Sequence, residues 1–220
     1  MSKKAKTGSL LKKFDYEREL WAKGIELIAG VDEVGRGPLA GPVVAASVIF
    51  PEGMPVEIPV KIDDSKKLTE KQRHEAYSWI IEHASCWGVG IVSVETIDKY
   101  NIRRAAIIAM KRAIENMPVQ PEHLLIDGLP IEHPPYPQTA IIKGDQLSIS
   151  IAAASIIAKT VRDELMIHYY DPKYPDYQFA RHKGYGTQIH TKAIQKFGYS
   201  PIHRRSFHLK NSSQEDLFKE

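Results

Sequence analysis

Apolar residues along this chain follow two spacings, one typical of strands and one typical of helices. Short apolar runs predict five strands, at residues 27–33, 43–50, 86–93, 123–127 and 139–143. A Gly/Pro-rich turn joins the first two, which predicts a hairpin-like pair. Longer segments with apolar residues three and four positions apart predict helices, at residues 69–84, 102–117 and 148–169.

Local signals support these boundaries. Thr69 and Gln72 have the spacing of a capping box, in which each side chain accepts a hydrogen bond from the other residue's backbone. A proline-rich loop before the last predicted strand cannot be helical. Strands that alternate with helices predict an α/β protein with helices packed against a sheet. The chain has no internal repeat or low-complexity linker, so no sharp domain boundary is predicted.

Length and composition limit the class of protein. A chain of 220 residues with 43% hydrophobic content fits one large domain, or a domain with a helical appendage. Cys86 is the only cysteine, which excludes an internal disulfide and fits a reducing compartment. The lysine-rich residues 1–13 lack the apolar core of a signal peptide, and no apolar run is long enough to cross a bilayer. We therefore expect a cytoplasmic protein with no membrane partner.

The net charge of +3 is small, but it is unevenly distributed. Residues 177–213 contain no Asp or Glu, and they carry seven Lys or Arg residues and four histidines. Aromatic side chains are interleaved with them, at Tyr185, Phe197, Tyr199 and Phe207. A long basic stretch with aromatic residues favours a polyanionic partner such as nucleic acid over an ordinary solvated surface.

The end of the first predicted strand carries the most specific chemistry. Two adjacent carboxylates, Asp32 and Glu33, are followed by the turn Gly35-Arg36-Gly37. Carboxylates bind hard divalent cations, glycines let the backbone approach a ligand, and arginine binds phosphate through a planar fork. This combination indicates phosphodiester chemistry. It matches neither a dinucleotide-binding motif nor a P-loop, because a strand-like run follows where those motifs open a helix.

Six more short motifs follow along the chain. They are Asp64-Ser65-Lys66-Lys67-Leu68, Leu125-Ile126-Asp127-Gly128, Lys143-Gly144-Asp145, Ala153-Ala154-Ser155-Ile156-Ile157-Ala158-Lys159, His182-Lys183-Gly184-Tyr185 and His203-Arg204-Arg205-Ser206-Phe207. Together with the segment around Asp32, they resemble the type 2 ribonucleases H, in particular bacterial ribonuclease HII. The matches occur in the family's order and span residues 28–208, nearly the whole chain.

The resemblance implies the ribonuclease H-like fold, a mixed five-stranded sheet flanked by helices. It also implies C-terminal helices that help to bind substrate. We therefore expect one structural unit with three parts. They are an N-terminal extension (residues 1–26), a catalytic core (residues 27–185) and a C-terminal helical extension with a polar tail (residues 186–220). The apolar pattern alone predicts the α/β class, and the strand order comes from the family.

Four carboxylates are the predicted catalytic and metal-binding residues: Asp32, Glu33, Asp127 and Asp145. Three lie at or next to strand ends, where acids far apart in sequence can converge. Asp32 and Glu33 can share one site only if the strand bends or ends between them. Four such groups repel one another unless cations neutralise them. The resemblance assigns them as ligands of two divalent cations, Mg²⁺ or Mn²⁺.

Taken singly, each of these acids would be interpreted as a turn former or a helix cap. Their joint placement and the family match favour the metal site. Other acids compete with them and are interpreted as loop or helix-surface residues; these are Asp63, Asp64, Asp163 and Glu164.

Distinguishing RNA from DNA requires detection of the 2′-hydroxyl, which both donates and accepts hydrogen bonds. The turn Gly35-Arg36-Gly37 offers backbone groups, and its two glycines have no side-chain bulk. Tyr185, which lies between two glycines, offers a ring and a hydroxyl. The resemblance implies that these positions sense the ribose and the DNA–RNA junction. Without it, they would be interpreted as a tight turn and a loop aromatic.

Several cationic residues are candidates for phosphate contacts, which position a nucleic acid without reading its sequence. The substrate-binding candidates are Lys66, Lys159 and Lys183, with Lys67, Arg204 and Arg205 in addition. Each is also compatible with an ordinary surface charge. For Arg204 and Arg205, capping of the C-terminal helices is a further interpretation.

We predict a metal-dependent endoribonuclease. It would hydrolyse the RNA strand of RNA–DNA hybrids and nick duplex DNA on the 5′ side of embedded ribonucleotides, leaving 3′-hydroxyl and 5′-phosphate ends. One alternative is another polynucleotidyl transferase of the same superfold that acts on DNA. Another is a non-enzymatic nucleic-acid-binding module, which leaves the four carboxylates without a purpose.

Two further expectations concern the ends of the chain. The short lead favours ribonuclease HII over ribonuclease HIII, which usually carries a large N-terminal substrate-binding domain. Residues 214–218 faintly resemble the sliding-clamp-binding pentapeptide of bacterial replication proteins, but Glu215 stands where an apolar residue is usual. A polar tail is the favoured interpretation, so we expect at most a weak clamp contact, and a monomer.

Overall fold

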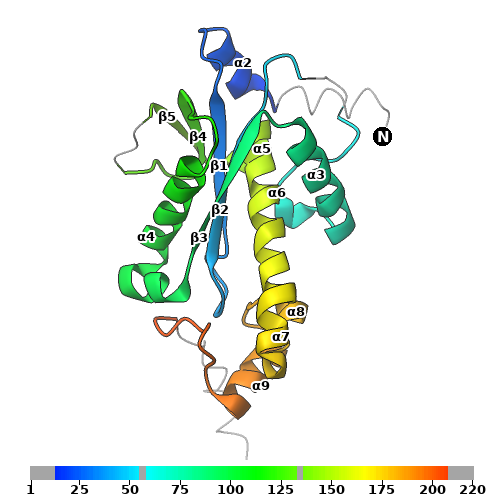
Figure 1. Ribbon diagram of the computed structural model, residues 1–220, viewed down its shortest axis with the longest axis vertical. Helices are drawn as coiled ribbons and strands as arrows, with labels where there is room; N and C mark the ends of the chain where they lie inside the picture. The colour runs from blue at the N-terminus through cyan, green and yellow to red at the C-terminus, as the bar shows by residue number, and fades with distance from the viewer. Residues whose placement is uncertain (1–12, 55–57, 133–135, 208–220) are drawn as a thin grey trace, which may run out of the picture.

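A mixed five-stranded sheet forms the centre of the computed structural model, which describes residues 13–54, 58–132 and 136–207 (Figure 1). In the order β3-β2-β1-β4-β5, the pairs β1–β2 and β2–β3 are antiparallel, whereas β1–β4 and β4–β5 are parallel. The strands are β1 (Ile28–Val34), β2 (Val43–Ile49), β3 (Cys86–Val92), β4 (His123–Asp127) and β5 (Gln138–Ile141). The predicted fold class and the β1–β2 hairpin-like pair are confirmed.

Burial explains the composition of the strands. Every residue of β2 is buried, because it has a neighbouring strand on each side and helices on both faces. Its sequence is accordingly a continuous run of small and β-branched residues. The edge strand β3 alternates instead, with Trp87 and Ile91 exposed and the residues between them buried or partly buried.

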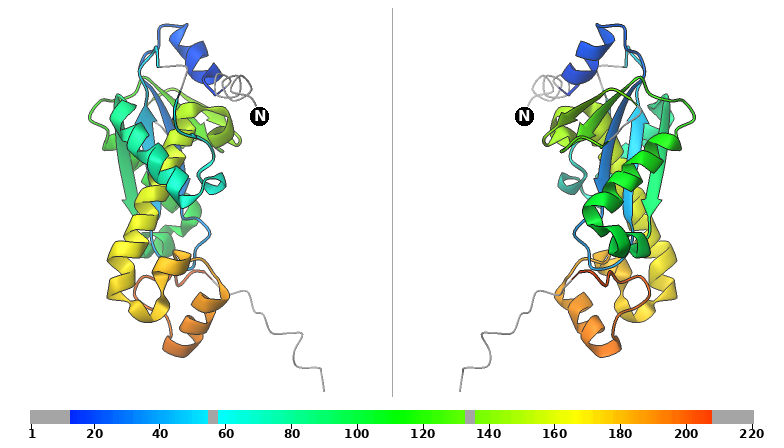
Figure 2. Two further views of the ribbon diagram at one scale, coloured as in Figure 1. Left: turned by 90° about the vertical axis from the view of Figure 1, so that its right-hand side faces the viewer. Right: turned by 90° about the vertical axis from the view of Figure 1, so that its left-hand side faces the viewer.

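Long helices cover the two faces of the sheet (Figure 2). One face packs against α4 (Val94–Glu115), and the other packs against α3 (Glu70–His83) and α6 (Ile149–Glu164). An apolar cluster fills each interface. Because burial of one large apolar side chain contributes about 1.5–3 kcal/mol, these two layers are the main source of stability.

The helix starts reflect local capping. The Thr69 hydroxyl accepts a hydrogen bond from the Gln72 N–H (3.3 Å), and the Gln72 side chain accepts one from the Thr69 N–H (3.0 Å), as predicted. In α4 two helical stretches meet at Asn101, whose φ of 69° lies in the left-handed region. Its side chain accepts a hydrogen bond from the Arg104 N–H (3.1 Å). The helix predicted from residue 102 onward is therefore the second stretch of α4.

The close packing of α6 on β1 depends on Gly30. A Cβ at this position would lie 2.1 Å from the backbone carbonyl carbon of Ser150, so no larger residue fits. Helical structure continues beyond Glu164 through η2 (Leu165–Tyr170), a π-helix, and this accounts for the long helix predicted to residue 169. As a result, polar side chains of α6 lie next to those of β1.

Short helices form the two ends of the molecule in Figure 1. At one end, α2 (Asp15–Trp21) buries Glu17, whose carboxylate accepts hydrogen bonds from the Ser148 hydroxyl (2.6 Å) and the Ser150 N–H (3.1 Å). The opposite end consists of α7 (Asp171–Lys173), η3 (Pro175–Tyr177), α8 (Phe179–His182) and α9 (Gln188–Phe197). Within the described residues, no helix is long and apolar enough to cross a membrane.

Candidate active site

Two of the predicted carboxylates are neighbours on β1. Asp32 is buried, with 5% of its surface exposed. Burial raises its pKa, and a hydrogen bond with the Ser155 side chain of α6 lowers that pKa by a smaller amount. The Glu33 carboxylate accepts a hydrogen bond from the Arg36 guanidinium (3.2 Å). The strand continues to Val34, so it does not end between the two acids. The Asp32 carboxylate accepts a hydrogen bond from the Glu33 N–H (2.7 Å), and the charge of Glu33 acts on Asp32, so the two acids interact without an end of the strand between them.

Asp127 and Asp145 come from adjacent segments. Asp127 is the last residue of β4, which pairs with β1. Its carboxylate accepts a hydrogen bond from the Gly144 N–H (2.6 Å), at the start of α5 (Gly144–Leu147). Asp145 lies in the first turn of α5 and is buried, and the Lys13 ammonium donates to its carbonyl oxygen (3.3 Å). The bond to Gly144 thus holds Asp127 beside the segment that carries Asp145.

Asp127 is an electrostatic neighbour of the other three carboxylates. Burial raises the pKa of Asp32 well above its ordinary value, and the charges of Glu33 and Asp127 raise it further. Burial also raises the pKa of Glu33, with an added contribution from Asp127. For Asp145, burial is again the largest cause of a raised pKa, followed by the charges of Asp64 and Asp127. The fold therefore brings all four predicted carboxylates into one negatively charged region.

In this conformation the four carboxylates are not arranged as a metal-binding site. In the part of the chain that the structure describes, no three His, Cys, Asp or Glu side chains are arranged to hold a metal ion. Asp32 and Asp127 each direct a carboxylate oxygen at a backbone N–H. The donor set nevertheless has the oxygen chemistry that hard cations prefer. The raised pKa values reflect burial first and repulsion between the carboxylates second.

Asp64 is a further acid at this site. It precedes η1 (Ser65–Lys67), is buried, and accepts a hydrogen bond from the Lys66 N–H (3.0 Å). Its loop position agrees with the sequence interpretation, but its burial beside Asp145 was not predicted. A tertiary contact explains the difference, because the Ser65 and Ser155 hydroxyls lie 2.9 Å apart and join this loop to α6.

The expectation that Asp163 lies on a loop or helix surface is wrong. Its side chain is buried and pairs with Lys159 (2.7 Å) and Arg73 (3.2 Å). Asp163 has the spacing of an exposed helical acid, but α3 packs beside α6, covers this residue and supplies Arg73. Asp63 does lie in a loop, where it pairs with Lys13 (2.9 Å).

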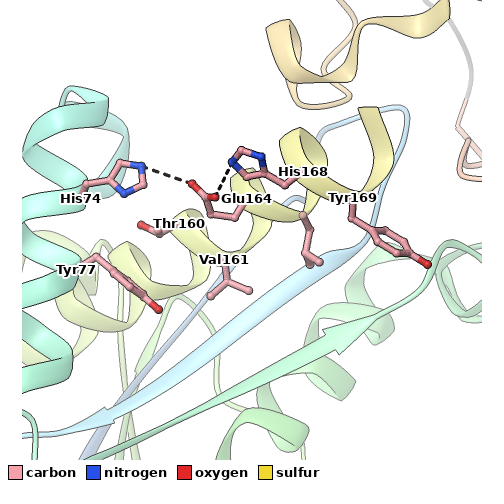
Figure 3. A pocket seen from close by; sticks show the side chains of 8 residues that line it. His74, Tyr77, Thr160, Val161, Glu164, His168 and Tyr169 are labelled. Atoms are coloured by element: carbon pink, nitrogen blue, oxygen red, sulfur yellow. Dashed lines mark ion pairs between the residues drawn. The ribbon is translucent and has the colours of Figure 1, made fainter. Parts of the chain in front are cut away.

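A groove of about 560 Å³ between α3 and α6 is separate from this site. Figure 3 shows Glu164 between His74 and His168, at ion-pair distances of 3.6 and 3.0 Å. Tyr77 and Val161 contribute to its apolar wall, and none of the four predicted carboxylates line it. Glu164 therefore lies on a helix surface, as the sequence interpretation has it.

The two glycines of the Gly35-Arg36-Gly37 turn differ in their surroundings. Gly35 has a φ of 90°, and a Cβ there would lie 2.4 Å from the Arg162 Nε and 2.8 Å from the Pro42 carbonyl oxygen. Glycine is therefore required at this position by the fold. A Cβ at Gly37 would meet no atom within 4 Å, and both Arg36 and Gly37 are exposed. The open side of the turn is available to a ligand.

Tyr185 lies close to the same turn. It is 41% exposed, and its ring is flanked by the Lys159 ammonium at 5.7 Å and the Arg162 guanidinium at 5.8 Å. The carbonyl of the preceding Gly184 accepts a hydrogen bond from the Leu39 N–H (2.8 Å). The loop that carries Tyr185 is thereby fastened to the segment after the Gly35-Arg36-Gly37 turn.

The cationic candidates have different environments. Lys66 is exposed, and its charge acts on Asp145. Lys159 is paired with Asp163, and the Lys183 ammonium donates to the Ala180 carbonyl. The expectation that Arg204 contacts phosphate or caps a C-terminal helix is wrong, because its side chain is 1% exposed and donates to carbonyls of the turn after β1. Its neighbour Arg205 is exposed.

Sequence comparison decides the family. The family model of ribonuclease HII matches residues 29–210. A ribonuclease HII from Leuconostoc citreum (strain KM20) is 50% identical over 195 residues, which cover 89% of this chain and 73% of that relative. The chain belongs to the ribonuclease HII family. It is therefore a type 2 ribonuclease H, an endonuclease, as the motifs predicted.

Solved structures confirm the fold of this ribonuclease HII. The ribonuclease H2 from Pyrococcus horikoshii OT3 is 26% identical with a TM-score of 0.69, covering 82% of this chain and 93% of that one. A second match is the structure titled as a PCNA:RNase HII complex from Archaeoglobus fulgidus. It is 24% identical with a TM-score of 0.64 and covers 86% and 99% of the two chains.

Sequence reasoning missed several residues of the ribonuclease HII site. Ser155, Arg162 and Asp64 contact or flank predicted site residues, and Lys13 reaches the backbone of Asp145. For Ser155 and Arg162 a signal was present, because Ser155 interrupts the apolar run of residues 151–158 and Arg162 lies two helical turns further along the same helix. Asp64 opens one of the family motifs, but its burial beside Asp145 depends on loop packing, and the contact of Lys13 depends on loop packing as well.

Proposed function

We propose that this ribonuclease HII hydrolyses the RNA strand of RNA–DNA hybrids and nicks duplex DNA on the 5′ side of an embedded ribonucleotide. The products would carry 3′-hydroxyl and 5′-phosphate ends. The observation that carries the assignment of the site is the position of Asp127, which lies near enough to Asp32, Glu33 and Asp145 for its charge to add to burial, the main cause that raises the pKa of each. Such a cluster next to an exposed glycine turn fits a phosphodiester substrate.

The four carboxylates are proposed to hold two divalent cations, Mg²⁺ or Mn²⁺. When bound, the cations would supply the positive charge and Lewis acidity that phosphodiester hydrolysis requires. Because no three of the described acids form a ready cage, binding would require rotation of these side chains. In Asp32 and Asp127 the backbone hydrogen bond uses Oδ1, so Oδ2 of each could bind a cation.

Hydrolysis would replace the bond from phosphorus to O3′ with a bond from phosphorus to a water oxygen. The O3′ atom takes up a proton and leaves as the 3′-hydroxyl, and the phosphate stays on the 5′ end of the other fragment. No covalent enzyme intermediate is needed, so no Ser, Cys or His nucleophile is assigned. The protein's task is to position the phosphate and to hold negative charge where cations can neutralise it.

Selectivity for ribose is assigned to Gly35, Arg36, Gly37 and Tyr185. The open space at Gly37 and the exposure of Tyr185 support this, because a sugar can approach both. Lys66 and Lys183 are proposed to contact phosphates, together with Lys159. For Lys159, the pairing with Asp163 also supports a second role, which is to hold the Tyr185 ring.

The regional division is proposed as well, with residues 186–220 extending the substrate surface beyond a core of residues 27–185. The clamp-like pentapeptide at 214–218 lies outside the described residues. The Archaeoglobus structure is of a complex with PCNA, and a clamp contact of this chain stays a prediction. The monomeric state and the cytoplasmic location also stay predictions.

The test uses two labelled DNA duplexes of one sequence, one all-DNA and one with a single ribonucleotide, each incubated with the purified protein and Mg²⁺ or Mn²⁺. We expect cleavage of the second duplex alone, on the 5′ side of the ribose, and no cleavage in EDTA. Mapping of the ends would identify the 3′-hydroxyl and 5′-phosphate. Equal cleavage of both duplexes would indicate a DNA-directed enzyme of the same superfold and refute the proposal.

A further inference from the structure

Arg204 has an unexpected place for a residue in a basic segment. It follows α9 in the chain, yet it is 1% exposed. Its N–H donates to the Leu39 carbonyl (2.9 Å), and the preceding His203 forms a β-bridge with Ala40. The chain beyond the last described helix therefore returns to the turn that follows β1.

The Arg204 side chain binds four carbonyl oxygens of that turn. Nη2 donates to Gly35 (2.6 Å), Gly41 (2.8 Å) and Pro42 (3.3 Å). Nη1 donates to Arg36 (3.1 Å), and Nε donates to Gly41 (3.0 Å). A guanidinium suits this task, because its five N–H donors are fixed in one plane.

These bonds determine the direction of two backbone N–H groups. In a trans peptide the N–H points away from the C=O of the same unit. With the carbonyls of Gly35 and Arg36 directed at Arg204, the N–H groups of Arg36 and Gly37 point to the opposite side. Neither N–H donates to another backbone group within the described residues. Arg36 and Gly37 are both exposed, and a Cβ at Gly37 would meet no atom within 4 Å, so a ligand has room to approach this part of the turn.

We propose that Arg204 is a positioning residue for recognition of the ribose. By holding the Gly35 and Arg36 carbonyls, it presents two N–H donors toward the 2′-hydroxyl without touching substrate itself. The inference rests on the proposed function, because it deepens the role of the Gly35-Arg36-Gly37 turn. Its specific consequence is that loss of the guanidinium weakens discrimination between ribose and deoxyribose.

The test compares the wild-type protein with Arg204→Lys. A lysine can reach some of the carbonyls but cannot hold four of them in one plane. For each protein, kcat/KM is measured on a duplex with one ribonucleotide, and the all-DNA duplex of the same sequence serves as a competitive inhibitor. Arg112→Lys is the matched control, because Arg112 also donates to a carbonyl (Ile91, 2.8 Å) but lies on α4.

We expect Arg204→Lys to lower kcat/KM on the ribonucleotide duplex roughly tenfold, the effect of about one lost hydrogen bond, with the inhibition constant of the all-DNA duplex unchanged. Equal changes in both quantities, or no change in either, would overturn the role of Arg204. A wild-type protein with no preference for the ribonucleotide duplex would instead refute the proposed function.

A second variant covers the case in which Arg204→Lys does not fold. Asp98 on α4 accepts hydrogen bonds from the Arg205 N–H (2.9 Å), the Ser206 N–H (3.0 Å) and the Ser206 hydroxyl (2.6 Å). Asp98→Ala loosens the segment that carries Arg204 without removing the guanidinium. We expect a smaller loss of ribose discrimination in the same direction, and full discrimination in this variant would count against the proposal.

Discussion

A buried pair of histidines predicts a steep loss of stability in mild acid. The His190 Nε2 and His203 Nε2 atoms lie 2.9 Å apart. His203 Nδ1 accepts a hydrogen bond from the Ser200 N–H (2.9 Å), so its proton lies on Nε2 and is donated to His190. His190 then donates from Nδ1 to the Tyr185 carbonyl (3.0 Å). The arrangement is satisfied only when both rings are neutral.

The magnitude follows from the two pKa values. Burial is the main cause that lowers the pKa of His190 and of His203 from 6.5 to about 4. As the pH falls below 6.5, the unfolded chain binds protons on these two rings that the folded chain excludes, so the contribution of the pair to stability is lost between pH 6.5 and pH 4. The carboxylates with raised pKa contribute in the opposite direction, and comparison with a variant that lacks one ring separates the two effects. From pH 7 to pH 5 each histidine should cost about 2 kcal/mol of unfolding free energy.

The assay is urea unfolding at pH 7 and pH 5, followed by the fluorescence of the three tryptophans. Hydrogen exchange of peptides from residues 177–207 would locate the loss at the end of the molecule that carries Tyr185. His190→Gln removes one titrating ring and should reduce the pH-dependent loss by about 2 kcal/mol. His168→Gln, at a largely exposed histidine, is the control. Equal losses in the wild-type protein and His190→Gln would refute the reasoning.

Further predictions concern the carboxylates and the glycines. Asp127→Asn should reduce turnover at least a hundredfold while hybrid binding persists, because it removes the charge shared by the whole cluster; near-normal activity would contradict the site assignment. Gly35→Ala should lower thermal stability and activity together, because its Cβ would meet Arg162 and Pro42. Gly37→Ala should lower only the activity on ribonucleotide substrates, because its Cβ would meet no protein atom. Gly30→Ala should destabilise the fold by about 3 kcal/mol in urea unfolding, since its Cβ would press on the backbone at Ser150, and an unchanged midpoint would argue against this close contact.

Local patterns explain how much of the fold could be predicted. The strands and the long helices follow from apolar spacing, and the start of α3 follows from its capping box. The order of the strands could not be derived in this way, because it depends on which segments pair across the chain. The family's motifs implied a mixed five-stranded sheet, and the antiparallel β1–β2 and parallel β1–β4 pairings confirm that the sheet is mixed.

The limits of prediction from the sequence are clearest at charged residues. Asp163 and Arg204 have the sequence context of surface residues, yet both are buried by segments distant in the chain. Spacing along one helix shows which residues share a face, but it does not show what covers that face. Burial of a charge requires a partner from elsewhere, here Arg73 for Asp163 and backbone carbonyls for Arg204.

By itself, then, the sequence determined the α/β class, the approximate extent of the strands and long helices, and the family, and it pointed to the four carboxylates and the Gly35-Arg36-Gly37 turn as the candidate site, because motifs and periodicity are properties of neighbouring residues. Only the tertiary structure decided that Asp127 acts on all three other carboxylates and that Arg204 holds the turn beside Tyr185. The physical reason is that electrostatic coupling and hydrogen bonding depend on distances of a few ångströms, and chain folding sets those distances between residues that lie far apart in the sequence.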